Sequence, residues 1–320
     1  MRETHRDYIG IEIGGTKLQI VLGDADARIL ERYRASVDKT KGAAGIRSNI
    51  KEFLDVIIKK HYPYAIGMGF GGPIDYKKGK VAISHQVEGW ADFEIKQWIK
   101  KISGLNCFVE NDANTAALAE AYKGAGVGYK KVFYVTLGSG VGGGMINQGE
   151  IYHGTVPGES EIGLMVYDKS GLNIESQCSG WALDRKVRNY ITTYPKSVMA
   201  GLVKDETKME ARFLQEAIML GDSGADSILD ESTDILAWGL SHVVHLFHPE
   251  IIILGGGLSL MGELLREKVS FNLKKYITKV FQPGPEVKIS TLGEDVVCVG
   301  ALLLAIKNLN SVVGKRTKNL

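Results

Sequence analysis

The residues best suited to chemistry lie in two glycine-rich turns, each placed between two apolar runs. Residues 14–17 (GGTK) separate YIGIEI from LQIVLG, and residues 138–143 (GSGVGG) separate VFYVTL from GMIN. Glycine turns expose successive backbone N–H groups with no side chain in the way, so they can wrap phosphate oxygens. An ordinary tight hairpin would account for one such turn. Two matching copies, with a further glycine run at residues 255–257, favour phosphate binding.

The second turn also satisfies a dinucleotide-binding spacing, because Gly138, Gly140 and Gly143 form G-x-G-x-x-G. That motif requires its last glycine to open a helix whose N-terminus holds the pyrophosphate. Here the glycines run into Met145 and Ile146 and then into a polar turn, which is the pattern of a hairpin. The sequence therefore favours strand, turn and strand, and it contains no G-x-x-x-x-G-K-[ST] loop.

Two carboxylates lie beside these features. Asp112 follows the short apolar run CFV and precedes an alanine-rich segment, so it is a good helix N-cap and also a candidate general base for an attacking hydroxyl. Glu12 lies between apolar neighbours beside the first glycine turn. A stray charge on an edge strand is one interpretation of Glu12, and a carboxylate that holds magnesium, directly or through water, is the other.

Three histidines, His242, His245 and His248, recur at every third position before Pro249. Such a series rotates progressively off any single helical face, and a metal site would need a shared face and another ligand. We therefore expect histidines that are satisfied or exposed.

Strands that alternate with helices must position the glycine turns and the carboxylates. Besides the two hairpins, apolar runs predict strands at residues 64–70, 107–109 and 251–254, and helical periodicity predicts helices over residues 41–61, 93–102, 113–123, 232–247 and 297–306. This alternation indicates an α/β class. The repeated hairpin indicates two related domains.

Length, charge and cysteine usage bound the class of protein. The 320 residues exceed the usual size of one domain, and 39 Lys plus Arg against 37 Asp plus Glu give no electrostatic reason to expect nucleic acid. Three separated cysteines are typical of a reducing cytoplasm. The polar start MRETHRDY does not resemble a signal peptide, and no apolar run is long enough for a membrane helix.

Seven segments, found in order from about residue 8 to residue 306, resemble the ROK family of sugar kinases and sugar-responsive repressors. They are IEIGGTK, GFGGPID, ENDANTAALAE, VTLGSGVGGGMINQGEIYHG, ESEIG, HPEIIILGGGLS and LGEDVVCVGALLLA. The resemblance, which is to glucokinases, fructokinases and N-acetylhexosamine kinases, implies a duplicated ribonuclease H-like fold of the actin, sugar kinase and Hsp70 type. It places one domain at residues 1–115 plus 304–320, the other at residues 116–303, and a cleft between them.

The same resemblance implies the ligands and their residues. ATP with Mg²⁺ would be the cofactor, a sugar the substrate, and a homodimer in the cytoplasm the assembly. The residues that would bind the sugar are Gly72, Asn111, Asp112, Glu161 and Glu175, with Asp112 as the general base. Those that would bind the nucleotide are Glu12, Gly14, Gly15, Thr16, Lys17, Gly138, Ser139, Gly140, Gly255, Gly256 and Gly257.

The sequence departs from the family at several positions. Members commonly carry a Gly-His pair and a cysteine cluster that bind a structural zinc, but here Leu164 follows Gly163 and only Cys178 lies nearby. One cysteine cannot complete a tetrahedral site, so we predict no zinc. Glu12 replaces the more usual aspartate, as in fructokinase-like relatives, and His85 stands where asparagine is common.

These observations predict ATP-dependent phosphorylation of a hexose or N-acetyl-hexosamine hydroxyl. A sugar-responsive repressor is the first rival, but only seven residues precede Tyr8, and a winged-helix segment would not fit there. The second rival is a catalytically inert protein that binds sugar or nucleotide. Leu164 keeps this rival open, because leucine cannot make the hydrogen bonds of the family histidine.

Overall fold

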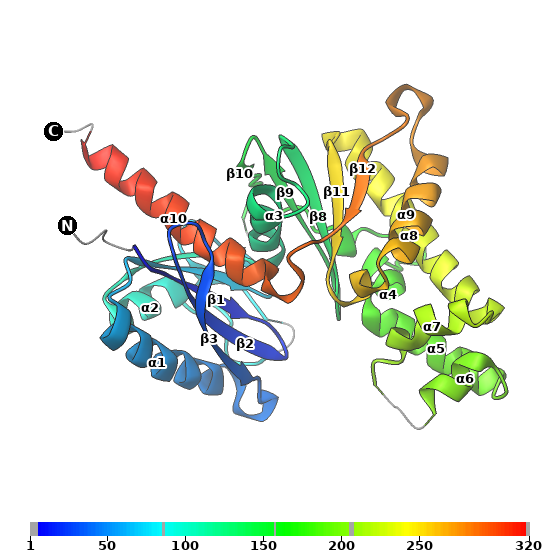
Figure 1. Ribbon diagram of the computed structural model, residues 1–320, viewed down its shortest axis with the longest axis horizontal. Coiled ribbons are helices and arrows are strands. Elements are labelled where there is room, and N and C mark those ends of the chain that lie inside the picture. Colours follow the sequence, from blue (N-terminus) through cyan, green and yellow to red (C-terminus); the bar gives the residue numbers. More distant parts are fainter. Residues whose placement is uncertain (1–5, 85–86, 157, 205–207, 318–320) are drawn as a thin grey trace. The chain divides into compact units, whose positions relative to one another are not determined.

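Two compact units make up the chain. The computed structural model describes residues 6–84, 87–156, 158–204 and 208–317, with only the backbone for residues 311–317. Unit 1 contains residues 1–123, 149–159 and 294–320, and unit 2 contains residues 124–148 and 160–293 (Figure 1).

This division differs from the boundaries proposed from the sequence, which assign residues 116–123, 149–159 and 294–303 to the second domain. The physical reason is the packing of two helices. Helix α3 (Asp112–Lys123) would be cut by a boundary at residue 115, and along its length it packs against α10 (Val296–Thr317). Both helices therefore belong to unit 1 over their full length.

Unit 1 is built on a five-stranded sheet with the order β3-β2-β1-β4-β7. Its strands are β1 (Tyr8–Ile13), β2 (Lys17–Gly23), β3 (Ile29–Ser36), β4 (Ala65–Phe70) and β7 (Asn106–Asn111). The first three strands are antiparallel neighbours, whereas β4 and β7 run parallel to β1. The carboxyl ends of β1, β4 and β7 therefore share one edge of the sheet.

Helices cover both faces of this sheet (Figure 1). Helices α1 (Gly42–His61) and α2 (Ile95–Ser103) pack on the face that carries Ile9, Ile11 and Ile13, and together they form the hydrophobic core of unit 1. Helices α3 and α10 lie on the other face. The short elements of this part of the chain are η1 (Lys39–Lys41), β5 (Ile74–Asp75), β6 (Lys80–Val81), β10 (Glu150–Ile151) and η6 (Gly293–Asp295).

Glycines bring α10 unusually close to the sheet. A Cβ atom added at Gly67 would lie 1.8 Å from the carbonyl oxygen of Ala301, and one added at Gly10 would lie 2.8 Å from another backbone oxygen of α10. On α10 itself, a Cβ atom at Gly300 would lie 1.9 Å from the carbonyl oxygen of Thr115 in α3. The sheet, α10 and α3 thus touch backbone to backbone.

Unit 2 repeats the sheet of unit 1. Within it the strands β8 (Lys131–Leu137), β9 (Val141–Asn147), β11 (Ile251–Gly255) and β12 (Glu286–Ile289) have the order β9-β8-β11-β12. Strands β8 and β9 are antiparallel, and β11 and β12 run parallel to β8. This arrangement matches β2-β1-β4-β7, so each predicted glycine hairpin is the first hairpin of its sheet. The dinucleotide alternative is wrong, because Gly143 pairs with Val135 inside a strand instead of opening a helix.

Most of the remaining residues of unit 2 are helical. The longest helix, α8, begins at Ser223 instead of residue 232, because the Asp222 side chain caps it by accepting from the N–H groups of Gly224 and Ala225. The elements are η2 (Ile162–Leu164), α4 (Ile174–Cys178), α5 (Gly180–Thr193), α6 (Val198–Val203), η3 (Glu210–Phe213), α7 (Leu214–Met219), α8 (Ser223–Phe247), η4 (Gly257–Met261), α9 (Glu263–Tyr276) and η5 (Lys279–Phe281). Within the described residues, no helix combines the length and apolarity that crossing a membrane requires.

Candidate functional site

Asn111 and Asp112 lie at the junction between β7 and α3, where the sequence places them. The Asn111 Oδ1 atom accepts hydrogen bonds from the N–H groups of Ala113 at 2.8 Å and Asn114 at 3.2 Å. These contacts make Asn111 the N-cap of α3. Asp112 is instead the first residue of the helix, so its interpretation as the N-cap is wrong.

Gly72 lies beside the same junction. The Asn111 Nδ2 atom donates to the carbonyl oxygen of Gly72 at 3.2 Å. A Cβ atom added at Gly71 would lie 3.4 Å from Oδ2 of Asp112, and the Gly71 N–H donates to the carbonyl oxygen of Ile13 at 2.8 Å. Three of the predicted sugar residues and the start of the first glycine turn thus lie together at the carboxyl ends of parallel strands, where α/β sheets usually bind ligands.

Glu12 lies in the central strand of the unit 1 sheet, so its interpretation as an edge-strand charge is wrong. The residue is 7% exposed. Its carboxylate accepts from Nε2 of Gln19 at 2.7 Å and lies 3.4 Å from Nζ of Lys17. The Glu12 carboxylate thus already contacts an amide and an ammonium group. Mg²⁺ keeps several of its waters when bound, so a carboxylate with these partners could hold the ion through a water.

The second glycine turn is held by hydrogen bonds inside unit 2. The N–H of Gly138 donates to the carbonyl oxygen of Gly140 at 3.0 Å, and the N–H of Gly180 donates to that of Gly138 at 2.7 Å. Glu175, predicted to bind sugar, accepts from the N–H of Val141 at 2.9 Å through Oε2. Glu175 therefore supports the turn that contains Ser139.

The glycine run at residues 255–257 lies at the same end of the unit 2 sheet as this turn. Gly255 pairs with Thr136, near the end of β8. Gly256 has φ +80°, and a Cβ atom there would lie 2.6 Å from the backbone of Leu137. Gly257 begins the 3₁₀ helix η4, which is followed by α9.

Glu161 directly precedes η2, and the segment after it packs against β9. A Cβ atom at Gly163 would lie 2.0 Å from the carbonyl oxygen of Val141. Leu164, the position of the family histidine, is 60% exposed. Cys178 is buried, its thiol donates to the carbonyl oxygen of Ser232 at 3.2 Å, and burial raises its pKa to about 12.

Two of the three histidines near Pro249 make individual hydrogen bonds. His242 Nδ1 lies 2.9 Å from the carbonyl oxygen of Trp238, and His245 Nε2 accepts from the N–H of Thr278 at 3.2 Å. His248 is the left-handed C-cap of α8. His85 lies outside the described residues.

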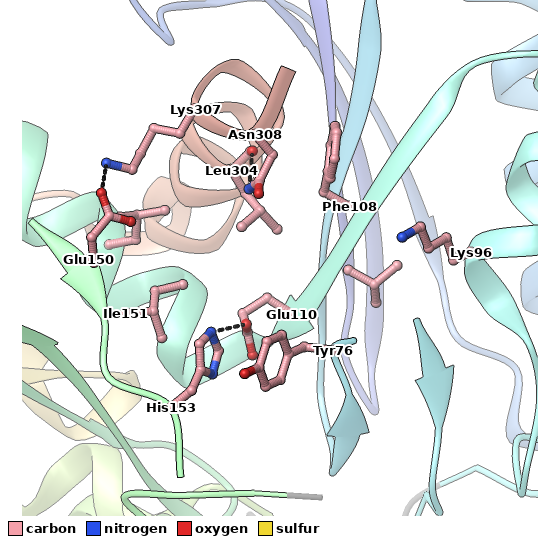
Figure 2. A pocket seen from close by; sticks show the side chains of 12 residues that line it. Tyr76, Lys96, Phe108, Glu110, Glu150, Ile151, His153, Leu304, Lys307 and Asn308 are labelled. Atoms are coloured by element: carbon pink, nitrogen blue, oxygen red, sulfur yellow. Dashed lines mark hydrogen bonds and ion pairs between the residues drawn. The ribbon is translucent and has the colours of Figure 1, made fainter. Parts of the chain in front are cut away.

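Glu110, His153 and Glu159 form a cluster in unit 1 that the sequence does not reveal. Figure 2 shows the imidazole of His153 directed at Glu110 and lying flat against Tyr76, beside a cavity of about 290 Å³. His153 Nε2 lies 3.4 Å from Glu110 Oε2, and its Nδ1 lies 3.2 Å from Glu159 Oε1. The Tyr76 and His153 rings are stacked, with centroids 3.6 Å apart and planes 9° apart.

We call Glu110, His153 and Glu159 the carboxylate–histidine triad. Its ligating atoms all lie within 4.8 Å of one another, so they are close enough for a metal ion. Each imidazole nitrogen, however, already contacts a different carboxylate. Burial raises the pKa of Glu110. Burial also opposes ionisation of Glu159, but the hydrogen bonds from His153 and Asn114 outweigh it and lower the Glu159 pKa.

The chain is similar to known proteins over nearly its whole length. Residues 8–308 match the model of the ROK family. A glucokinase of Thermotoga maritima is 32% identical over 302 residues, covering 92% of this chain and 95% of that protein. A glucokinase of Halalkalibacterium halodurans is 30% identical over 320 residues, covering 96% of this chain and 97% of that protein.

A solved structure of a ROK family glucokinase from Streptomyces griseus, in complex with glucose and AMPPNP, is also similar. Its TM-score is 0.83 at 30% identity, and the match covers 94% of this chain and 99% of that chain. This similarity confirms the predicted α/β class and the duplicated two-domain fold of the actin and sugar kinase type.

Proposed function

The chain belongs to the ROK family, and from this premise we propose that it is an ATP-dependent kinase of a hexose or N-acetyl-hexosamine. The observation that carries the proposal is the junction between β7 and α3. Asn111 performs the capping, and Asp112 presents its carboxylate next to Gly71 at the carboxyl ends of the strands. The relatives named glucokinase, and the glucokinase bound to glucose and AMPPNP, support this function.

In the proposed reaction, Asp112 accepts the proton of a sugar hydroxyl while that oxygen bonds to the γ-phosphorus of ATP and the bond to ADP breaks. Asn111 and the backbone of Gly72 would orient the sugar. The glycine turn of each unit offers backbone N–H groups to phosphate oxygens. Mg²⁺ bound with ATP would neutralise phosphate charge, and Glu12 is the residue of unit 1 that would hold its water shell.

A coupled assay of ADP release tests the proposal. The panel is glucose, fructose, mannose, allose, N-acetylglucosamine and N-acetylmannosamine, each assayed with ATP and Mg²⁺. We expect turnover on at least one of these sugars. If ATP binds but no sugar is phosphorylated, the inert binding protein replaces the kinase as the better account.

Leu164 provides a test of sugar specificity. In the family, the histidine at this position contacts the sugar, whereas the exposed leucine here cannot form a hydrogen bond. One regained hydrogen bond contributes about 0.5–1.5 kcal/mol. We therefore expect Leu164→His to lower the KM for glucose by about 2- to 10-fold. Steady-state kinetics with Leu164→Met as the control would measure this, and an unchanged KM in Leu164→His would show that the side chain does not reach the sugar.

A further inference from the structure

The carboxylate–histidine triad lies one residue from the proposed sugar site and is connected to it by hydrogen bonds. Glu110 Oε1 accepts from the N–H of Asn111 at 2.8 Å. The Asn114 Nδ2 atom donates to Glu110 Oε1 at 3.2 Å and to Glu159 Oε1 at 2.6 Å. Asn111 is the cap of α3 and Asn114 is in its first turn, so both carboxylates of the triad hold the start of this helix.

The two carboxylates of the triad are buried, and His153 is their ion-pair partner. The side chains of Glu110 and Glu159 are only 5% and 8% exposed, and their ion pairs within the described residues are with His153. Two buried carboxylates that share one amide would repel each other without a counter-charge. Lys307 lines the cavity beside the triad but does not replace the histidine, because its ammonium group contacts Glu150 at 2.9 Å and the Tyr122 hydroxyl at 2.7 Å.

The imidazole lies between the two carboxylates. Its Nε2 atom is beside Glu110 and its Nδ1 atom is beside Glu159. One ring therefore contacts both acidic side chains. The charged and titratable groups around the imidazole and its cavity are Tyr76, Lys96, Glu110, Glu150, Glu159 and Lys307.

We propose that His153 is a positioning residue of the sugar site, which holds Glu110 and Glu159 together and thereby fixes Asn111 and the first turn of α3. This inference rests on the proposed sugar kinase function. His153 comes from the loop after β10, and its stacking on Tyr76 keeps the imidazole in the plane that reaches both carboxylates. The segment of residues 149–159 is thus tied to the residues that would orient the sugar.

The first test is a kinetic comparison of His153→Ala with the wild type in the full chain. Hydrogen bonds to charged groups are among the strong ones, so we expect the KM for the sugar to rise about tenfold or more. The KM for ATP should change by less than about twofold, because the partners of the triad within the described residues include Asn111, Asn114 and Tyr76 but none of the predicted nucleotide residues. Glu150→Gln is the matched control: it removes an exposed carboxylate of the same segment, paired with Lys307, and should leave both constants unchanged.

A double variant tests the repulsion itself. If His153 acts by offsetting the charge of Glu159, adding Glu159→Gln to His153→Ala should recover part of the lost sugar affinity, by about threefold or more. Equal increases in the KM for sugar and for ATP would show general damage and overturn the positioning role. So would a sugar KM within twofold of the wild type in His153→Ala.

Hydrogen exchange gives a readout that does not depend on catalysis. We expect the N–H groups of Ala113 and Asn114 to exchange faster in His153→Ala, because the Asn111 cap that protects them loses its support. If the wild type phosphorylates no sugar, the proposed function is refuted. The hydrogen-exchange comparison would still test whether His153 supports the Asn111 cap. Unchanged exchange, or a stoichiometric divalent metal found in the purified wild type and lost in His153→Ala, would overturn the proposal.

Discussion

Replacing Asp112 with asparagine should lower kcat by about 10² to 10⁴ while the fold and the affinity for sugar are retained, because general-base catalysis contributes about this factor. Asparagine keeps the Oδ1 atom that accepts from the N–H of Ala113 at 2.9 Å. The amide cannot take the proton of the sugar hydroxyl at neutral pH. The measurement is steady-state ADP release with the preferred sugar, together with sugar binding by calorimetry.

Two controls separate catalysis from folding in this variant. Thermal unfolding of Asp112→Asn should match the wild type, because Asn111 performs the capping of α3. Asp92→Asn removes an exposed carboxylate of unit 1 that pairs with Lys80, and it should retain full activity. Near-normal turnover in Asp112→Asn would refute its assignment as the base.

Gly67→Ala should destabilise unit 1 by about 3 kcal/mol or more, the upper end of the range for an overpacked core. The added methyl group would lie 1.8 Å from the carbonyl oxygen of Ala301 and 3.0 Å from the N atom of Ala305. Both atoms belong to the backbone of α10, so no side chain can turn away to make room. Urea unfolding of the full chain, followed by a probe in unit 1, would measure the loss.

Gly201→Ala is the matched control for this substitution. Gly201 lies in α6 and a Cβ atom there would meet no atom within 4 Å. Alanine is the better helix former by about 1 kcal/mol, so Gly201→Ala should leave stability unchanged or slightly increased. If Gly67→Ala unfolds like the wild type, α10 does not approach the sheet as closely as the structure has it.

Local patterns were enough to predict much of the fold. The periodicity of residues 41–61 and 113–123 predicts helices α1 (Gly42–His61) and α3 (Asp112–Lys123) to within one residue at each end. Strand β3 (Ile29–Ser36) has no such signal, because none of its residues is fully buried and charged side chains interrupt its apolar ones. Burial of an edge strand depends on packing against neighbours that are distant in the sequence, so the local sequence does not predict it.

The site was predictable where it depends on consecutive residues. Both glycine turns and the strand–helix junction at Asp112 follow from short motifs. The assignment of the cap to Asn111 did not, because both residues are good caps and their backbone geometry decides between them. The carboxylate–histidine triad could not be predicted from the sequence, for a different reason. His153 and Glu110 are far apart in the sequence, and only the folded chain brings them into contact.

The contact between α10 and the glycines of the unit 1 sheet has a consequence for biosynthesis. The ribosome makes the strands of this sheet first, then all of unit 2, and only then α10. Until that point α3 is the helix that lies on this face of the sheet, and the glycines that α10 will meet offer no side chains for burial. Domains usually complete their folding from the N-terminus onward during synthesis. In this chain we expect the reverse order, in which unit 2 folds before unit 1 can complete its folding.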